Sequence, residues 1–180
     1  MDFTRPARRR FLGFGITAGL ALVCPSARAA LAIAPRRLQF ESLHTGERLA
    51  TTYWADGGYV PDELRRINHA LRDHRTGDVK AIDPGLLDLL VALRERLATQ
   101  APFQIISAYR SPATNAMLAE HSSGVARKSL HTQGLAIDIR VPGRQLTAVR
   151  DAALALRGGG VGFYPRSDFV HVDVGRVRSW

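Results

Sequence analysis

Residues 135–141 read Leu-Ala-Ile-Asp-Ile-Arg-Val, and residues 169–174 read Phe-Val-His-Val-Asp-Val. Apolar and polar side chains alternate along both stretches, and this period of two predicts β-strands that have one apolar and one polar face. The three valines of the second stretch share a face that we expect to be buried. Each stretch is therefore predicted to be a strand whose apolar side faces the core.

The polar faces of the two strands carry the candidate site residues. His171 and Asp173 share one face of the second strand, and Asp138 lies on the polar face of the first. Two neighbouring strands with these patterns would put Asp138 and His171 on the same face of a sheet. His131 comes just before the first strand. Residues 132–134, which connect the two, include a glycine that lets the chain fold back.

Two imidazoles and one carboxylate that converge make the ligand set of a catalytic zinc site, which keeps a fourth position open for water. The same alternation is also consistent with a polar face that simply lies against solvent. We expect His69 and His74 on the surface, because they lie on or just past a helix rich in arginine. His44 lies beside a turn and His121 in a polar loop, and neither has a metal-ligating neighbour at a useful spacing.

The rest of the chain adds helices and strands to this pair. Apolar periodicity and turn residues predict strands over 37–43, 49–54, 103–109 and 161–164, and helices over about 59–74, 83–98, 112–120 and 144–157. The predicted fold class is α+β, with a small antiparallel sheet and helices packed on one face. We expect a single domain over residues 30–180, with an N-terminal hairpin at about 36–55 and a metal-site core at about 100–180.

The first 29 residues are predicted to be a cleaved export signal. Residues 8–12 read Arg-Arg-Arg-Phe-Leu, a twin-arginine pattern of the form Arg-Arg-x-Phe-Leu. An apolar stretch of eleven residues follows, where a bilayer span needs about 20. Residues 27–29 provide a small-x-small cleavage site. We therefore expect the twin-arginine export machinery to deliver the chain to the periplasm, with no stable membrane insertion after cleavage. The alternative is a basic anchor helix that stays attached.

The composition restricts the partners. The 180 residues contain 25 lysines and arginines against 16 acidic residues, a formal charge of +9. Cleavage after residue 29 would remove five arginines and one aspartate, so this charge would fall by four to +5, which suits a polyanionic wall. No helix-turn-helix signature or aromatic stacking motif favours nucleic acid. The one cysteine, Cys24, lies in the leader, which excludes a cysteine-ligated zinc or thiol enzyme.

The residues around the candidate ligands also resemble a known family. Residues 129–138 read Ser-x-His-x-x-Gly-x-Ala-x-Asp, and Asp168-x-x-His171 follows. This pattern is similar to that of the zinc peptidases of the D-Ala-D-Ala carboxypeptidase and hedgehog type. Residues 107–111, 159–164 and 169–180 resemble the YcbK-like murein endopeptidases within that group, so the likeness runs from the first hairpin to the end of the chain.

The resemblance implies a role for each matching position. It makes Zn²⁺ the cofactor and gives as its ligands His131, Asp138 and His171. Asp168 matches the general base that takes a proton from zinc-bound water, whereas Asp173 would either hydrogen-bond a ligand imidazole or replace Asp168 as the base. Arg110 matches the arginine that contacts the substrate carbonyl or carboxylate, and Ser129 would hydrogen-bond a ligand or the substrate.

The implied function is that of an exported zinc peptidase that cuts peptide crosslinks of peptidoglycan. Two positions depart from the dipeptidase branch, which has Glu where this chain has Asp168 and Trp where it has Val170. These departures favour a crosslink endopeptidase over a D,D-carboxypeptidase, which remains an alternative. The other alternative is a non-catalytic module of the same fold that keeps zinc and binds the wall or a partner.

Overall fold

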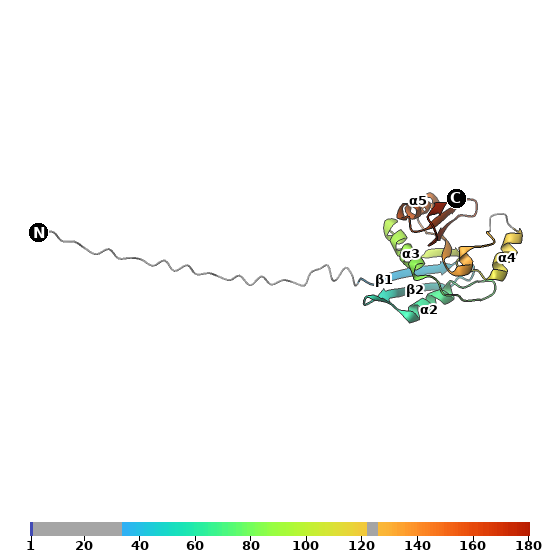
Figure 1. Ribbon diagram of the computed structural model, residues 1–180, viewed down its shortest axis with the longest axis horizontal. Coiled ribbons are helices and arrows are strands. Elements are labelled where there is room, and N and C mark those ends of the chain that lie inside the picture. Colours follow the sequence, from blue (N-terminus) through green and yellow to red (C-terminus); the bar gives the residue numbers. More distant parts are fainter. Residues whose placement is uncertain (2–33, 122–125) are drawn as a thin grey trace.

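The computed structural model describes Met1 and residues 34–121 and 126–180, so nearly all of the predicted export signal lies outside the described residues. An eight-stranded mixed sheet runs through this part in the order β3-β2-β1-β4-β5-β7-β6-β8 (Figure 1). Its strands are β1 (Arg36–Ser42), β2 (Arg48–Ala55), β3 (Gly58–Tyr59), β4 (Phe103–Ser107), β5 (Ala136–Arg140), β6 (Gly160–Tyr164), β7 (Phe169–Asp173) and β8 (Arg178–Ser179).

The α+β class is confirmed, but the predicted small antiparallel sheet is wrong in size and direction. β1 lies parallel to β4, and β6 lies parallel to β8, whereas the other neighbours are antiparallel. The parallel contact between β1 and β4 joins the N-terminal hairpin to the strands of the metal site. Local alternation does not reveal such long-range pairing, and β3 and β8 have only two residues each.

The described helices are α2 (Pro61–Ala70), α3 (Pro84–Arg96), α4 (Pro112–His121) and α5 (Leu146–Leu156). Thr51 and Tyr53 lie two residues apart in β2, so their side chains share one face of the sheet. The Thr51 hydroxyl donates a hydrogen bond to Glu63 of α2, and the Tyr53 hydroxyl donates one to Asp88 of α3. α2 and α3 therefore lie on the same side of the sheet, and α5 packs beside α3. The prediction that all helices pack on one face of the sheet is wrong for α4. Its Leu118 lines a pocket on the opposite face, together with His131 and His171.

The core lies between the sheet and helices α3 and α5. Leu86, Leu90 and Leu93 of α3 are fully buried there, as are the β5 and β7 side chains that the alternation places on the apolar face. Val170 and Val172 are buried as predicted, and Val174 is half-buried. In the described part of the chain, no helix is both long and apolar enough to cross a bilayer.

Candidate metal centre

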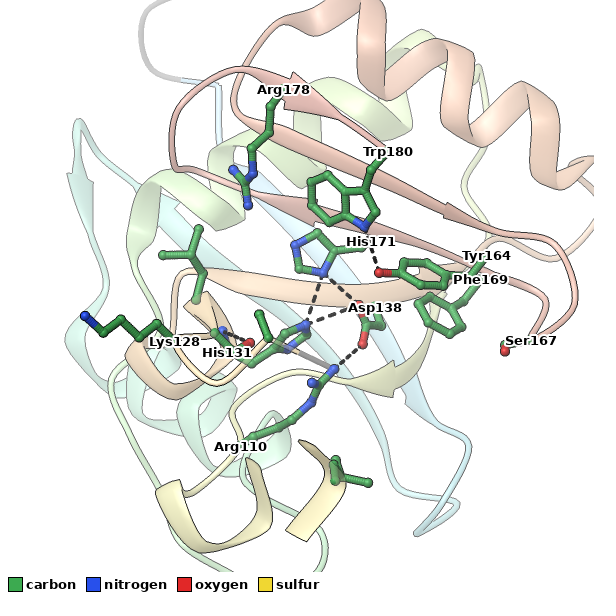
Figure 2. Close-up of a pocket in the computed structure, with 14 residues that line it drawn as sticks. Arg110, Lys128, His131, Asp138, Tyr164, Ser167, Phe169, His171, Arg178 and Trp180 are labelled. Atoms are coloured by element: carbon green, nitrogen blue, oxygen red, sulfur yellow. Dashed lines mark hydrogen bonds and ion pairs between the residues drawn. The ribbon is translucent and has the colours of Figure 1, made fainter. Parts of the chain in front are cut away.

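Three neighbouring segments bring the predicted metal ligands together on the polar face of the sheet. His131 lies in the 3₁₀ turn Leu130–Gln133, Asp138 in β5 and His171 in β7. Asp138 is paired directly with His171 in the β5–β7 register, as the alternation requires. The Nε2 atom of His131, the Oδ1 atom of Asp138 and the Nδ1 atom of His171 lie 2.9–3.2 Å from one another, and all three side chains are buried (Figure 2).

Local sequence explains how His131 reaches the sheet. The Ser129 side chain caps the turn by accepting a hydrogen bond from the His131 backbone N–H at 3.3 Å. Gly134 ends the turn with φ of 74°, and a side chain there would collide with the Ala81 carbonyl. Ser129 therefore has a clear structural role, and it also lines the pocket beside the ligands.

The hydrogen bonds of the two histidines fix which ring nitrogen faces the centre. The Nδ1–H of His131 donates to the Ala108 carbonyl at 2.6 Å, and the Nε2–H of His171 donates to the Asp173 carboxylate at 3.1 Å. Since both partners only accept, each ring in its neutral form keeps a free lone pair on the opposite nitrogen. Two imidazole lone pairs and a carboxylate oxygen converge here, and such a donor set fits a divalent cation such as Zn²⁺.

The charges of the trio respond to burial and to one another. Burial lowers the pKa of His131, so this ring is neutral, as a metal ligand must be. Burial acts to raise the pKa of Asp138, but the neighbouring His131 and His171 outweigh it and hold the pKa well below its usual range. Burial also acts to lower the pKa of His171, yet its hydrogen bonds to Asp138 and Asp173 raise it overall.

Arg110 lies beside the metal ligands. Its guanidinium reaches the second oxygen of Asp138 at 2.5 Å, and its Nε–H donates to the Ser107 hydroxyl at 2.8 Å. The side chain is nearly buried and lines the pocket from the end of the loop that follows β4 (Figure 2). Arg110 therefore holds Asp138 so that one carboxylate oxygen faces the two histidines.

Asp173 is fully buried behind His171 and has no free lone pair to offer a substrate. Besides the His171 ring, its carboxylate accepts hydrogen bonds from the backbone N–H groups of Gly160 and Gly175 and a two-point ion pair from Arg178. Burial acts to raise the pKa of Asp173, and these hydrogen bonds instead hold it well below its usual range. This geometry fits the predicted role of orienting a ligand imidazole.

The structure does not bring Asp168 into the same group. Asp168 lies in the turn between β6 and β7 with a φ of 53°, is 61% exposed at its side chain, and pairs with Arg140 at 2.9 Å. Its neighbours Ser167 and Phe169 line the pocket, but Asp168 does not. The other four histidines do not belong to this group. His69 is exposed as expected, whereas His74 is half-buried and stacks on His44 with ring centroids 3.9 Å apart.

The ligands open into a cavity of about 580 Å³. Its wall includes residues that the sequence reasoning did not single out, among them Tyr164, Arg178 and Trp180. Alternation along β6 carried a usable signal for Tyr164, because Gly162 pairs with His171 and Tyr164 lies two residues farther on the same face. No local pattern indicates that Trp180 would pack against His171, with ring centroids 5.2 Å apart.

Comparison with known proteins identifies the family. The family model described as peptidoglycan L,D-endopeptidase MepK matches residues 30–180. Proteins named peptidoglycan L,D-endopeptidase MepK from Escherichia coli strain K12 and from Shigella flexneri are 45% identical over the full length of both chains. A probable peptidoglycan L,D-endopeptidase MepK from Haemophilus influenzae is 38% identical over all of this chain and 98% of its own. The predicted resemblance is thus confirmed, and the chain belongs to the peptidoglycan L,D-endopeptidase MepK family of M15 peptidases.

Proposed function

We propose that this protein is a zinc-dependent peptidase that hydrolyses an amide bond in the peptide crosslinks of peptidoglycan. The observation that carries the proposal is the convergence of three buried metal-ligating atoms at the base of a cavity, next to an arginine. The names of the relatives support an L,D bond as the target. A crosslink between two diaminopimelate residues is such a bond.

Each residue of the centre has a defined task in this reaction. His131, Asp138 and His171 would hold the zinc, which supplies a Lewis acid for the carbonyl and lowers the pKa of a bound water to about 7. The guanidinium of Arg110 lies on the cavity wall, where it can hydrogen-bond a substrate carbonyl or carboxylate. Asp173 keeps the proton on Nε2 of His171, so that Nδ1 stays available as a ligand.

We infer that Asp168, rather than Asp173, accepts the proton from the attacking water. The oxygens of Asp173 are occupied by backbone N–H groups, His171 and Arg178, whereas Asp168 is exposed and held by one ion pair to Arg140. Asp168 would have to leave Arg140 and turn toward the cavity that its two neighbours line. Substrate binding over this turn is the step at which we expect that rearrangement.

Export is part of the same proposal. The twin-arginine pattern, the short apolar stretch and the cleavage site within residues 1–29 support delivery to the periplasm, where the wall lies. The formal charge of +5 that would remain after cleavage supports binding to an anionic polymer. The twin-arginine machinery and the peptidoglycan peptide are accordingly the partners that we propose.

A digest of purified peptidoglycan fragments tests the proposal. The protein is loaded with zinc and incubated with crosslinked dimers, with and without a chelator, and the products are identified by mass. We expect loss of L,D-crosslinked dimers that the chelator prevents, and a large loss of kcat in Asp168→Asn with zinc content unchanged. Release of only a terminal alanine would indicate a carboxypeptidase. A zinc-loaded protein that cuts nothing would favour the binding module.

A further inference from the structure

One wall of the cavity is aromatic and lies beside the metal ligands. Tyr164 ends β6 and stacks on Phe169, its register partner in β7, with ring centroids 4.5 Å apart. Trp180 packs between Tyr164 and His171: its indole Nε1–H donates to the Tyr164 hydroxyl at 2.7 Å, and its ring centroid lies 5.2 Å from that of His171. The Tyr164 hydroxyl is thus held at the edge of the centre (Figure 2).

The backbone fixes this arrangement. The Trp180 N–H donates to the Val161 carbonyl and the Trp180 carbonyl accepts from the Phe163 N–H, so Trp180 continues the pairing of β8 with β6. Its indole covers Gly162, where an added Cβ would lie 2.8 Å from the ring. Arg178 stacks on the indole at 4.8 Å. The position of Trp180, and with it the direction of its N–H, is therefore set by several independent contacts.

The direction of the Trp180 hydrogen bond decides what Tyr164 can do. An indole N–H can only donate, so the tyrosine oxygen is the acceptor and its own proton must point elsewhere. A hydroxyl that accepts one hydrogen bond also becomes a better donor through polarisation. Tyr164 lines the cavity, and a proton of its hydroxyl that points away from the indole can be donated to an oxygen atom of a bound molecule.

We propose that Tyr164 is a catalytic residue that donates a hydrogen bond to the substrate carbonyl oxygen as that oxygen gains negative charge, and that Trp180 is its positioning residue. This inference rests on the proposed function and assigns a second donor beside Arg110. The Tyr164 proton is shared with the oxyanion and is not transferred, so Tyr164 is unchanged when the amide bond breaks. A donor that acts on developing charge raises kcat more than it lowers KM.

Tyr164→Phe tests the role of the hydroxyl, because the ring and its stack on Phe169 stay. We expect kcat on the crosslinked dimer to fall about 10- to 100-fold, with KM and zinc content close to those of the unaltered protein. We also expect weaker binding of a phosphinate analogue of the dimer, whose tetrahedral oxygens imitate the reaction intermediate, but unchanged binding of the dimer itself. The matched control is Tyr59→Phe, which removes a hydroxyl bonded to Asp88 outside the cavity.

A double-mutant cycle tests the role of Trp180. Trp180→Phe keeps an aromatic ring but removes the N–H, so we expect a smaller loss of kcat than in Tyr164→Phe. The double variant should be no worse than Tyr164→Phe alone, because Trp180 acts only through the hydroxyl.

Three results would overturn the inference. Normal kcat and normal phosphinate affinity in Tyr164→Phe would exclude a catalytic role for the hydroxyl, and additive losses in the cycle would exclude the role of Trp180. If the unaltered zinc-loaded protein cut nothing, the proposed function itself would fail and Tyr164 would lose its assigned reaction. An active protein with an equally active Tyr164→Phe variant would instead overturn the tyrosine assignment alone.

Discussion

His171 has two ring nitrogens, and the surrounding carboxylates decide which of them can bind a metal ion. Asp173 accepts the proton of Nε2, so Nδ1 presents a lone pair toward His131 and Asp138. An amide at residue 173 could place its NH₂ group against this nitrogen. The ring would then have to accept at Nε2 and carry its proton on Nδ1, the nitrogen that the metal needs.

Asp173→Asn is therefore expected to weaken metal binding while leaving all three ligands in place. We predict a loss of about 10- to 100-fold in zinc affinity, measured by competition with a chromophoric chelator. Asp151→Asn is the matched control, because Asp151 is exposed on α5 and, among the residues that the structure describes, pairs only with its neighbour Arg150. Unchanged affinity in Asp173→Asn would mean that Asp173 does not set the tautomer of His171.

At the scale of elements, one buried carboxylate ties the loop after α2 to the start of α4. Asp73 is 1% exposed and accepts hydrogen bonds from the backbone N–H groups of Ser111 and Arg75 at 2.8 and 2.9 Å. Burial acts to raise the pKa of Asp73, but hydrogen bonds from Thr114, Ser111 and Arg75 keep it well below its usual range. Since Ser111 directly follows Arg110, this contact also fixes the loop that carries the arginine.

Asp73→Ala should destabilise the fold, because it leaves the buried N–H group of Ser111 without an acceptor. We predict a loss of about 1–3 kcal/mol in the free energy of unfolding, measured by urea denaturation. The contribution of this carboxylate is present above the unfolded-state pKa and is lost as the pH falls through the lowered folded-state pKa. Asp78→Ala, an exposed change in the same loop, should cost far less. Equal losses in the two variants would contradict the anchoring role.

The elements also show what the sequence could and could not predict. Alternation along residues 169–174 placed Val170 and Val172 in the core and His171 beside Asp138, because the face of a strand follows from its period alone. The parallel pairing of β1 with β4 depends on contacts about 60 residues apart in sequence, for which there is no local signal. The direction of the exposed Asp168 side chain likewise depends on its neighbour Arg140 rather than on its position before His171.

At the scale of the whole molecule, the metal centre joins segments that a folded sheet alone brings together. Its ligands come from the turn before β5, from β5 itself and from β7, and an unfolded chain does not hold them within 3.2 Å. A metal that binds only the folded state adds about 4 kcal/mol at a thousandfold excess over Kd. For a chain of this length, removal of the metal should therefore lower Tm by roughly 8–16 °C.

The size of this Tm difference should depend on pH through His171. In the metal-free fold, the pKa of His171 lies above the ordinary value of 6.5. The proton on His171 therefore stabilises that fold below pH 6.5, and this stabilisation is lost as the pH rises through the raised pKa. The same proton competes with the metal for Nδ1, so metal affinity rises over the same window. The gap in Tm between metal-loaded and metal-free protein should thus widen as the pH rises above 6.5, measured by calorimetry.

His121→Gln, an exposed change at the end of α4, should keep this widening, whereas His171→Gln should abolish it. A gap that stayed constant or narrowed with rising pH in the unaltered protein would show that no proton on His171 competes with the metal.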